Sequence, residues 1–308
     1  MATTKWIKEN SAITELTGYP LEKMNKDRLY KSALKLNSIK TQLEQHLSIK
    51  TNELFDIQDK IVLYDLTNTY FEGEKRNSKL AKYGRSKEKR SDCKLIVLAL
   101  VVNIYGFIKH SSIHEGNFSD CSSIEAIITS LDNVIGKHKP VSLFDAGIAT
   151  KENLATDDLG KYFIRTSMDM KQDVIVWNVY NTIREIENTF RTLKIDLDLR
   201  PIYHKKDEST IAHLNLGLLS YWLANTIRCQ LKLNGINYCW KEIVRIGNTQ
   251  KVITTTGYNK ASKEIMVRKC TEPEEKLEAL HTALKIKNRP FTKLKSVYTN
   301  RNKKTANH

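Results

Sequence analysis

The feature that most constrains the fold is an unbroken apolar run, LIVLALVV, at residues 95–102. A run of this length without a polar residue is typical of a strand covered on both faces, because neither side of it tolerates water. Residues 106–113 follow a Gly-containing turn at 103–106 and are expected to form its hairpin partner. The chain therefore needs a sheet with other layers packed against it.

The remaining segments predict a mixed α/β fold. Residues 1–56 are polar, with weak helical patterning, and are expected to form a short helical N-terminal segment. Strands are expected at 61–64, 141–144 and 162–164, and helices at 122–135, 173–197 and 209–233. This order indicates a mixed sheet with helices on both faces over residues 57–233. Residues 234–308 complete the chain as a basic C-terminal region, in which 285–304 is expected to be a mobile arm on DNA or a solvated tail.

The chain is strongly basic. Its 50 Lys and Arg residues exceed its 35 Asp and Glu residues, which gives a formal net charge of +15. Nucleic acid is the commonest partner for such a surplus, although a lysine-rich protein of ribosomal type has the same composition. The charge favours nucleic-acid binding without choosing an activity.

The five cysteines and the N-terminus bear on the compartment. The cysteines are far apart, odd in number and without CxxC spacing, which argues against both a disulfide framework and a zinc site. The N-terminus has no apolar signal segment, and the apolar stretch 211–231 carries His213, Asn215, Asn225 and Arg228. We expect a buried helix there, not a membrane span, and a protein of a reducing cytosol.

Two aspartates occupy equivalent places along the chain. Asp65 and Asp145 each follow a short apolar strand and precede small or polar residues. The carboxyl ends of strands in open α/β sheets are where functional sites are built. Because Asp also commonly begins an ordinary loop, the pair is suggestive and no more.

A third acid lies on the helix expected at 173–197. In a helical projection one narrow stripe holds Tyr180, Arg184, Glu187, Arg191 and Lys194. The neighbouring buried stripe consists of Val179, Ile186, Phe190, Leu193 and Leu197. Glu187 is thus expected beside the core-facing stripe and among cations, unless this face is a solvated ladder of salt bridges.

Five segments carry a resemblance to a known family: YDLTNTYFEG, GRSKEKRSD, EGNFSD, LFDAGIAT and YNTIREIENTFRTLKIDLDLRPIYHKKDESTIAHL. They are similar to DDE transposases of bacterial insertion sequences, in the group marked by a Tyr, Arg, Glu, Lys signature. Tyr180, Glu187 and Lys194 match that signature; its arginine position falls on Ile183, with Arg184 next to it. The resemblance implies a ribonuclease H-like fold in which Asp65, Asp145 and Glu187 are the catalytic residues and the metal ligands.

The same resemblance implies the chemistry and the partners. Three carboxylates select Mg²⁺ or Mn²⁺, and two such ions stabilise the attacking and leaving oxygens of a phosphodiester. The expected partner is double-stranded DNA, as the terminal inverted repeats of an element and as target, bound by a possible homodimer. The expected phosphate and DNA contacts are Tyr180, Arg184, Arg191, Lys194, Arg200, His204, Arg85, Lys87 and Arg90.

Several of these residues have a plain structural interpretation as well. Tyr180 is equally suited to packing, Arg200 to capping the preceding helix, and the basic residues at 85–90 to a solvated loop. For His213, which is not among the expected contacts, a satisfied interior histidine is the preferred interpretation.

The chain also departs from the family pattern. Only positions 146–186 separate Asp145 from Glu187, which leaves no room for the insertion domain usual in this group. Three hypotheses follow: an active transposase, an internally deleted remnant that only binds DNA, and a ribonuclease H-like nuclease without strand transfer.

Overall fold

The computed structural model describes residues 2–59, 61–86, 90–118, 141–144, 183–291 and 294–298. The chain divides into two units, Tyr30–Thr226 and a second one made of Met1–Leu29 with Ile227–His308. The expected elements at 122–135 and 162–164, and residues 173–182 of the expected helix, lie outside the described residues.

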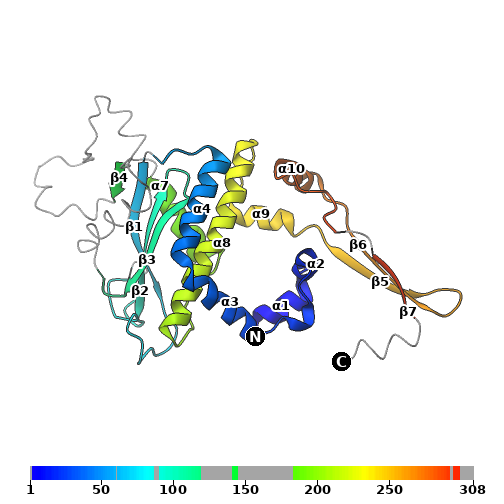
Figure 1. The fold of residues 1–308 in the computed structure, drawn as a ribbon, viewed down its shortest axis with the longest axis horizontal. Coiled ribbons are helices and arrows are strands. Elements are labelled where there is room, and N and C mark those ends of the chain that lie inside the picture. Colours follow the sequence, from blue (N-terminus) through cyan, green and yellow to red (C-terminus); the bar gives the residue numbers. More distant parts are fainter. Residues whose placement is uncertain are drawn as a thin grey trace, which may run out of the picture. The chain divides into compact units, whose positions relative to one another are not determined.

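The unit Tyr30–Thr226 is built on a mixed sheet (Figure 1). Its strand order is β3-β2-β1-β4, with β1 at Ile61–Tyr70, β2 at Leu95–Asn103, β3 at Ile108–Glu115 and β4 at Val141–Phe144. β1 and β2 are antiparallel, as are β2 and β3, whereas β4 runs parallel to β1. The prediction of a mixed α/β fold is therefore confirmed.

The apolar run forms β2, and every residue of that strand is buried, as expected. The turn to β3 also matches the prediction. The amide of Gly106 donates to the carbonyl of Asn103 at 2.9 Å, and Gly106 has φ +77°, a left-handed conformation that favours glycine. A Cβ at this position would lie 2.9 Å from the hydroxyl of Tyr221, so space as well as torsion requires glycine.

Helices accompany this sheet, and the first and last of them extend beyond Tyr30–Thr226. α4 (Lys40–Phe55) packs on β3, preceded by α3 (Lys26–Ser38). After the gap in the description come α7 (Ile183–Arg191), the π-helical turn η5 (Thr192–Asp196) and α8 (Asp207–Leu233). Helices were expected within 1–56 and at 173–197 and 209–233; the described parts confirm them, with a π-helical turn at the end of the second.

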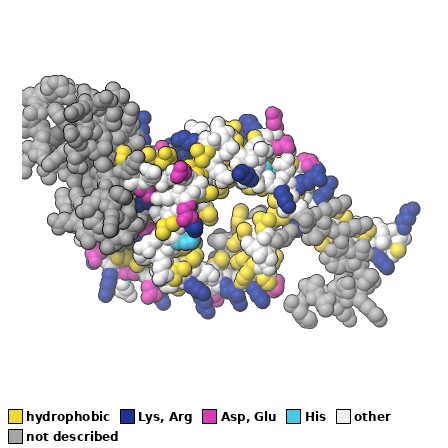
Figure 2. All heavy atoms as spheres, turned by 45° about the horizontal axis from the view of Figure 1, so that its top comes forward, with side chains coloured by type: hydrophobic (Ala, Val, Ile, Leu, Met, Phe, Trp, Pro, Cys, Tyr) yellow, Lys and Arg dark blue, Asp and Glu magenta, His cyan; other side chains and the backbone are white. Residues whose placement is uncertain are grey.

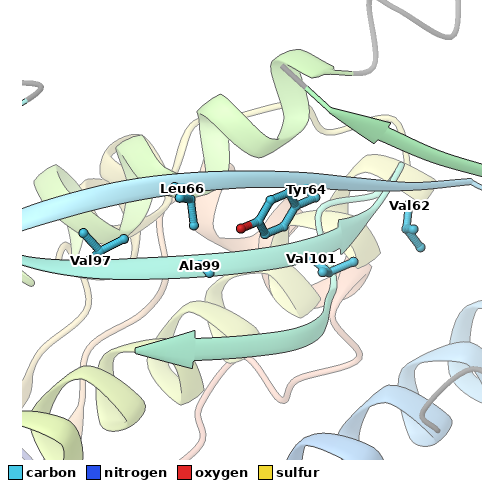
Figure 3. Close-up of a cluster of buried hydrophobic side chains, with 6 residues drawn as sticks. All are labelled: Val62, Tyr64, Leu66, Val97, Ala99 and Val101. Carbon is cyan, nitrogen blue, oxygen red and sulfur yellow. The ribbon is translucent and has the colours of Figure 1, made fainter. Parts of the chain in front are cut away.

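The two faces of the sheet differ. One face carries an apolar cluster from β1 and β2, shown in Figure 3: Val62, Tyr64, Leu66, Val97, Ala99 and Val101. On the other face Ser111 of β3 donates to the carboxylate of Glu44 in α4. Leu100 pairs with Ser111 and with Asp65, and paired residues share a face. Asp65 therefore lies on the face that α4 covers.

One expectation about β1 is wrong. Asp65 does not end the strand, because antiparallel pairing with β2 continues for five more residues, to the pair Tyr70 and Leu95. The β-branched Thr67 and Thr69 suit a strand that is paired on this side. The described pairing with β4 reaches Tyr64, which pairs with Phe144, so Asp65 follows the last described pair of the parallel ladder.

The second unit contains α1 (Ala2–Asn10), α2 (Ile13–Thr17), η1 (Leu21–Lys23), α9 (Trp240–Gly247) and α10 (Glu275–Ala283). A three-stranded antiparallel sheet of β5 (Val252–Tyr258), β6 (Glu264–Cys270) and β7 (Leu294–Tyr298) follows the order β5-β6-β7. Its apolar cluster is formed by Leu231, Ile243, Ile246, Leu277, Leu280 and Ala283.

The expectation of an arm or tail at 285–304 is wrong for residues 294–298. These residues form β7 and pair with β6, from Leu294 opposite Arg268 to Tyr298 opposite Glu264. The tail was inferred from charge and low apolar content, and neither prevents a strand that obtains its hydrogen bonds from a neighbour. None of the helices in 2–59 and 183–291 combines the length and apolar character needed to cross a membrane.

Candidate functional site

The strand register brings the first two expected acids to equivalent positions. β4 pairs with β1 in parallel, residue for residue, from Ile61 with Val141 to Tyr64 with Phe144. The next residue on β1 is Asp65, and the next residue after β4 is Asp145. Asp145 itself lies outside the described residues. The described part of the pairing thus ends on both strands directly before an aspartate.

Helix α7 supplies the third expected acid and packs against β1. Ile186, Phe190 and Leu193 are buried, and Figure 1 shows α7 beside β1. None of these three residues belongs to the Val62–Tyr64–Leu66 cluster on the opposite face. Glu187 is exposed, next to the buried row of its helix. The predicted placement of Glu187 on the edge of the buried stripe is confirmed.

The expected cationic stripe is divided by a change in helix type. Arg184 and Arg191 are exposed on α7, as the projection predicts. Lys194 lies in η5, where the amide of Leu197 bonds to the carbonyl of Thr192, five residues back. A π-helical turn holds more residues than an α-helical turn, so the spacing used for the projection no longer applies beyond Arg191. Tyr180 lies outside the described residues.

Three of the expected DNA contacts meet around one hollow. Its volume is about 400 Å³, and its lining consists of Tyr70, Arg90, Lys194, Ile195, Asp198 and Arg200. Arg90 is more than 100 positions from both Lys194 and Arg200 in the sequence, so their meeting depends on the tertiary fold. Two sequence-distant segments therefore supply one cationic hollow at the far end of β1. We call it the Tyr70 hollow.

Arg90 is held in place by two neighbours. Its guanidinium lies 4.6 Å from the ring centre of Tyr70, a cation–π distance, and its Nε donates to Asp92 at 3.0 Å. The hydrogen bond from Arg90 to Asp92 raises the pKa of the guanidinium and lowers the pKa of Asp92. Arg90 is therefore a fixed positive charge at one wall of the Tyr70 hollow.

The segment that carries Arg200 adds to the end of β1. The amide of Ile202 donates to the carbonyl of Tyr70 at 2.9 Å, and the amide of Glu72 donates to the carbonyl of Ile202 at 3.0 Å. Phe71 and Ile202 form a parallel bridge. These bonds place Arg200 at the Tyr70 hollow, a position that helix capping alone does not require.

His204, expected at the DNA, is packed among other side chains. Its ring lies 5.8 Å from that of Tyr30 and 5.1 Å from that of His213. Its carbonyl accepts from Lys75 Nζ at 2.7 Å. Burial, followed by His213 and Lys75, lowers the pKa of His204, so its neutral form is favoured.

His213 is an interior group with a partner, in line with the structural interpretation. Its Nε2 lies 3.2 Å from the carbonyl oxygen of Leu199, and burial lowers its pKa. The remaining basic loop is only partly described. Arg85 is exposed and its carbonyl accepts from Asn68 at 2.8 Å, whereas Lys87 lies outside the described residues.

Sequence reasoning missed Tyr70 and Asp198. Tyr70 was assigned to no site because β1 was expected to stop at Asp65. The alternation of β-branched Thr67 and Thr69 before Tyr70 was the available signal for a longer strand. Asp198 follows η5 and has a left-handed φ of +49°, a turn that the sequence analysis did not predict.

The donor set suits a hard divalent cation in its chemistry. Asp65 and Glu187 both offer carboxylate oxygens, the ligands that Mg²⁺ and Mn²⁺ prefer. Among the described residues no group of three His, Cys, Asp or Glu side chains converges, and the expected third ligand, Asp145, is not one of them. Comparison with protein-family models, with curated proteins and with solved structures gives no match to this chain.

Proposed function

We propose that this chain is a DDE-type transposase that cuts DNA strands with divalent metal. The observation that carries the proposal is the register of β1 and β4. In the described parallel pairing the last pair, Tyr64 and Phe144, is followed by Asp65 on β1 and by Asp145 in the sequence after β4. This register supports two neighbouring carboxylates, as shared metal ligands need to be. The antiparallel β1–β2–β3 meander with a parallel β4 also supports a ribonuclease H-like core.

Asp65, Asp145 and Glu187 would hold the metal. The bound ions, Mg²⁺ or Mn²⁺, would supply a polarised water and stabilise charge on the phosphate oxygens. The packing of α7 on β1 supports Glu187 as the ligand from the helix, since its buried neighbours Ile186 and Phe190 orient this face.

The cations around the Tyr70 hollow would position the DNA backbone. Arg90, Lys194 and Arg200 present three positive charges within one lining, whereas Asp198 is the acid there. Guanidinium and ammonium groups bind phosphate. Arg90 donates from Nε and Nη2 to Asp92 and lies over the Tyr70 ring, so it would contribute a positioned charge and not a bidentate bond. A phosphodiester backbone is the ligand that this lining fits.

A strand-cleavage assay tests the proposal. The substrate is a labelled duplex that carries the genomic DNA flanking the gene, incubated with Mg²⁺ or Mn²⁺. We expect Asp65→Asn, Asp145→Asn and Glu187→Gln each to abolish cleavage and leave duplex binding within about two-fold, because losing one carboxylate disrupts metal geometry. Glu185→Gln is the matched control, since Glu185 lies on the same helix two residues away.

The outcomes separate the three hypotheses. Cleavage with joined products supports a transposase, cleavage without joined products supports a nuclease, and binding without cleavage supports a remnant. If Glu187→Gln cuts at the rate of Glu185→Gln, Glu187 is not a ligand and the proposed triad is wrong.

A further inference from the structure

The hairpin of β5 and β6 is the most exposed ordered element of the second unit. Every residue of β5 from Ile253 to Tyr258 is exposed, and Tyr258 has 75% of its surface accessible. Among the described strands β5 is at the edge of its sheet and pairs with β6 alone. A strand of seven residues with so little buried surface contributes little to a core, so stability alone does not account for it.

The hairpin carries an excess of positive charge. Residues 251–270 contain five cations and a single acid, and the cations are Lys251, Lys260, Lys263, Arg268 and Lys269. Lys260 and Lys263 are exposed in the loop that joins the strands. Figure 2 shows dark blue side chains around the place where Figure 1 draws the β5–β6 loop. This excess of positive charge is complementary to a polyanion.

The loop between the strands is ordered by its own hydrogen bonds. The side-chain oxygen of Asn259 accepts from the amides of Ala261 and Lys263, both at 2.9 Å. The amide of Asn259 donates to the carbonyl of Lys263 at 3.0 Å. The two lysines therefore project from a defined turn, which lowers the entropic cost of placing them against a ligand.

One face of the hairpin carries polar groups suited to base edges. Thr254, Thr256 and Tyr258 alternate along β5, so their hydroxyl groups share that face, and all three are exposed. Arg268 pairs with Thr254 across the strands, and its Nη1 donates to the Thr254 hydroxyl at 3.2 Å. Met266 and Glu264 lie opposite Thr256 and Tyr258 on this same face, and the other face carries Ile253 and Val267.

We propose that the β5–β6 hairpin is a second DNA-contact site, which enters the major groove of B-form DNA with its Thr254–Thr256–Tyr258 face. β7 pairs with β6 on the side away from β5, so the face presented to the groove spans three strands, about 10 Å at the usual strand spacing. The major groove of B-form DNA is about 12 Å wide and takes a face of this width, whereas the deep, narrow major groove of duplex RNA does not. Lys260 and Lys263 contact phosphates at the groove edge. Only the choice of DNA as partner is shared with the proposed function, because no metal ligand takes part.

A salt titration of binding tests the phosphate contacts. The full chain is titrated into a labelled 20-base-pair random duplex in EDTA, so that cleavage plays no role. Each phosphate contact adds about 0.9 to the slope of log K against log salt, so Lys260→Ala/Lys263→Ala should reduce the slope by about 1.8. That change corresponds to a loss of affinity of about 60-fold at 0.1 M salt. Asp65→Asn should leave the slope unchanged.

The control variant removes the same charge from the same unit. Lys241→Ala/Lys276→Ala changes two exposed lysines, on α9 and α10, and should keep the wild-type slope. Equal slopes for the hairpin variant and the control would overturn the proposal even if the chain cuts DNA. Conversely, a reduced slope in a chain that never cuts DNA would support this site and leave the cleavage proposal without support.

Two further measurements test the groove. Thr254→Val/Thr256→Val keeps the β-branched shape and removes the hydroxyl groups, so it should weaken duplex DNA binding at least three-fold with no change of slope. Duplex RNA of the same length should bind at least ten-fold more weakly than DNA. Equal binding of RNA and DNA would overturn groove insertion. The molar mass of each hairpin variant is also compared with that of the wild type, without DNA. A lower molar mass for either variant would overturn the proposal, because it would show that β5 pairs with a second copy of the chain in the wild type.

Discussion

The buried ion pair under β3 offers the sharpest test of how this unit is held together. Lys109 is fully buried on β3, and its ammonium group lies 2.7 Å from the Asp59 carboxylate. It also donates to Ser48 at 3.0 Å and to Asn52 at 2.7 Å, both on α4. Asp59→Asn removes the only negative charge of this network and leaves the ammonium group buried among neutral groups.

We expect Asp59→Asn to lower the free energy of unfolding by about 4 kcal/mol, the usual cost of leaving one member of a buried pair uncompensated. With a urea m value of about 3 kcal/mol/M, the midpoint of unfolding falls by roughly 1.3 M. The matched control is Glu53→Gln, which breaks the exposed pair of Lys50 and Glu53 and should cost less than about 1 kcal/mol.

The pH dependence gives this prediction a second readout. Burial lowers the pKa of Lys109, while Asp59 opposes that shift, so Asp59→Asn should lower the pKa further. Between the folded pKa and the unfolded value of 10.5 the unfolded chain binds more protons, so stability rises with pH. Asp59→Asn should therefore regain stability as the pH rises towards 10.5, relative to Asp59→Asn/Lys109→Met. Equal losses in Asp59→Asn and Glu53→Gln, or no recovery at high pH, would refute the reasoning.

Two other changes test the turn and His110 of β3. Gly106→Ala should cost about 2–3 kcal/mol in urea unfolding, because φ is +77° and the new Cβ would meet the Tyr221 hydroxyl. In a Tyr221→Phe background it should cost less, measured against Tyr221→Phe alone, because that change also removes the hydrogen bond to the Gly106 carbonyl. A loss below about 0.5 kcal/mol would show that the turn adjusts freely. Burial, then Lys40 and His114, lower the pKa of His110 from 6.5 to about 4. The unfolded chain binds the proton more tightly in this window, so stability should fall by about 2 kcal/mol as pH falls from 6.5 to 4. His110→Gln should flatten that dependence, and an unchanged profile would contradict it.

Local sequence determined the elements whose buried side chains follow a short repeat along the chain, as in a strand or a helix. The run at 95–102 is β2, the Gly-containing turn leads into β3, and the spacing of Ile186, Phe190 and Leu193 gives the buried row of α7. These elements are predictable because the side chains that define them lie within a few residues of each other along one strand or helix.

The tertiary structure decided what depends on partners far away in the chain. Asp65 lies in mid-strand because β2 supplies hydrogen bonds as far as Tyr70, and residues 294–298 form a strand because β6 pairs with them. Lys109, a lysine in a strand, can be buried because Asp59 forms an ion pair with its ammonium group and Ser48 of α4 accepts a hydrogen bond from it. The Tyr70 hollow exists because Ile202 pairs with the end of β1. Such contacts join segments that local periodicity cannot relate, since each is fixed by a hydrogen bond or a charge on another element.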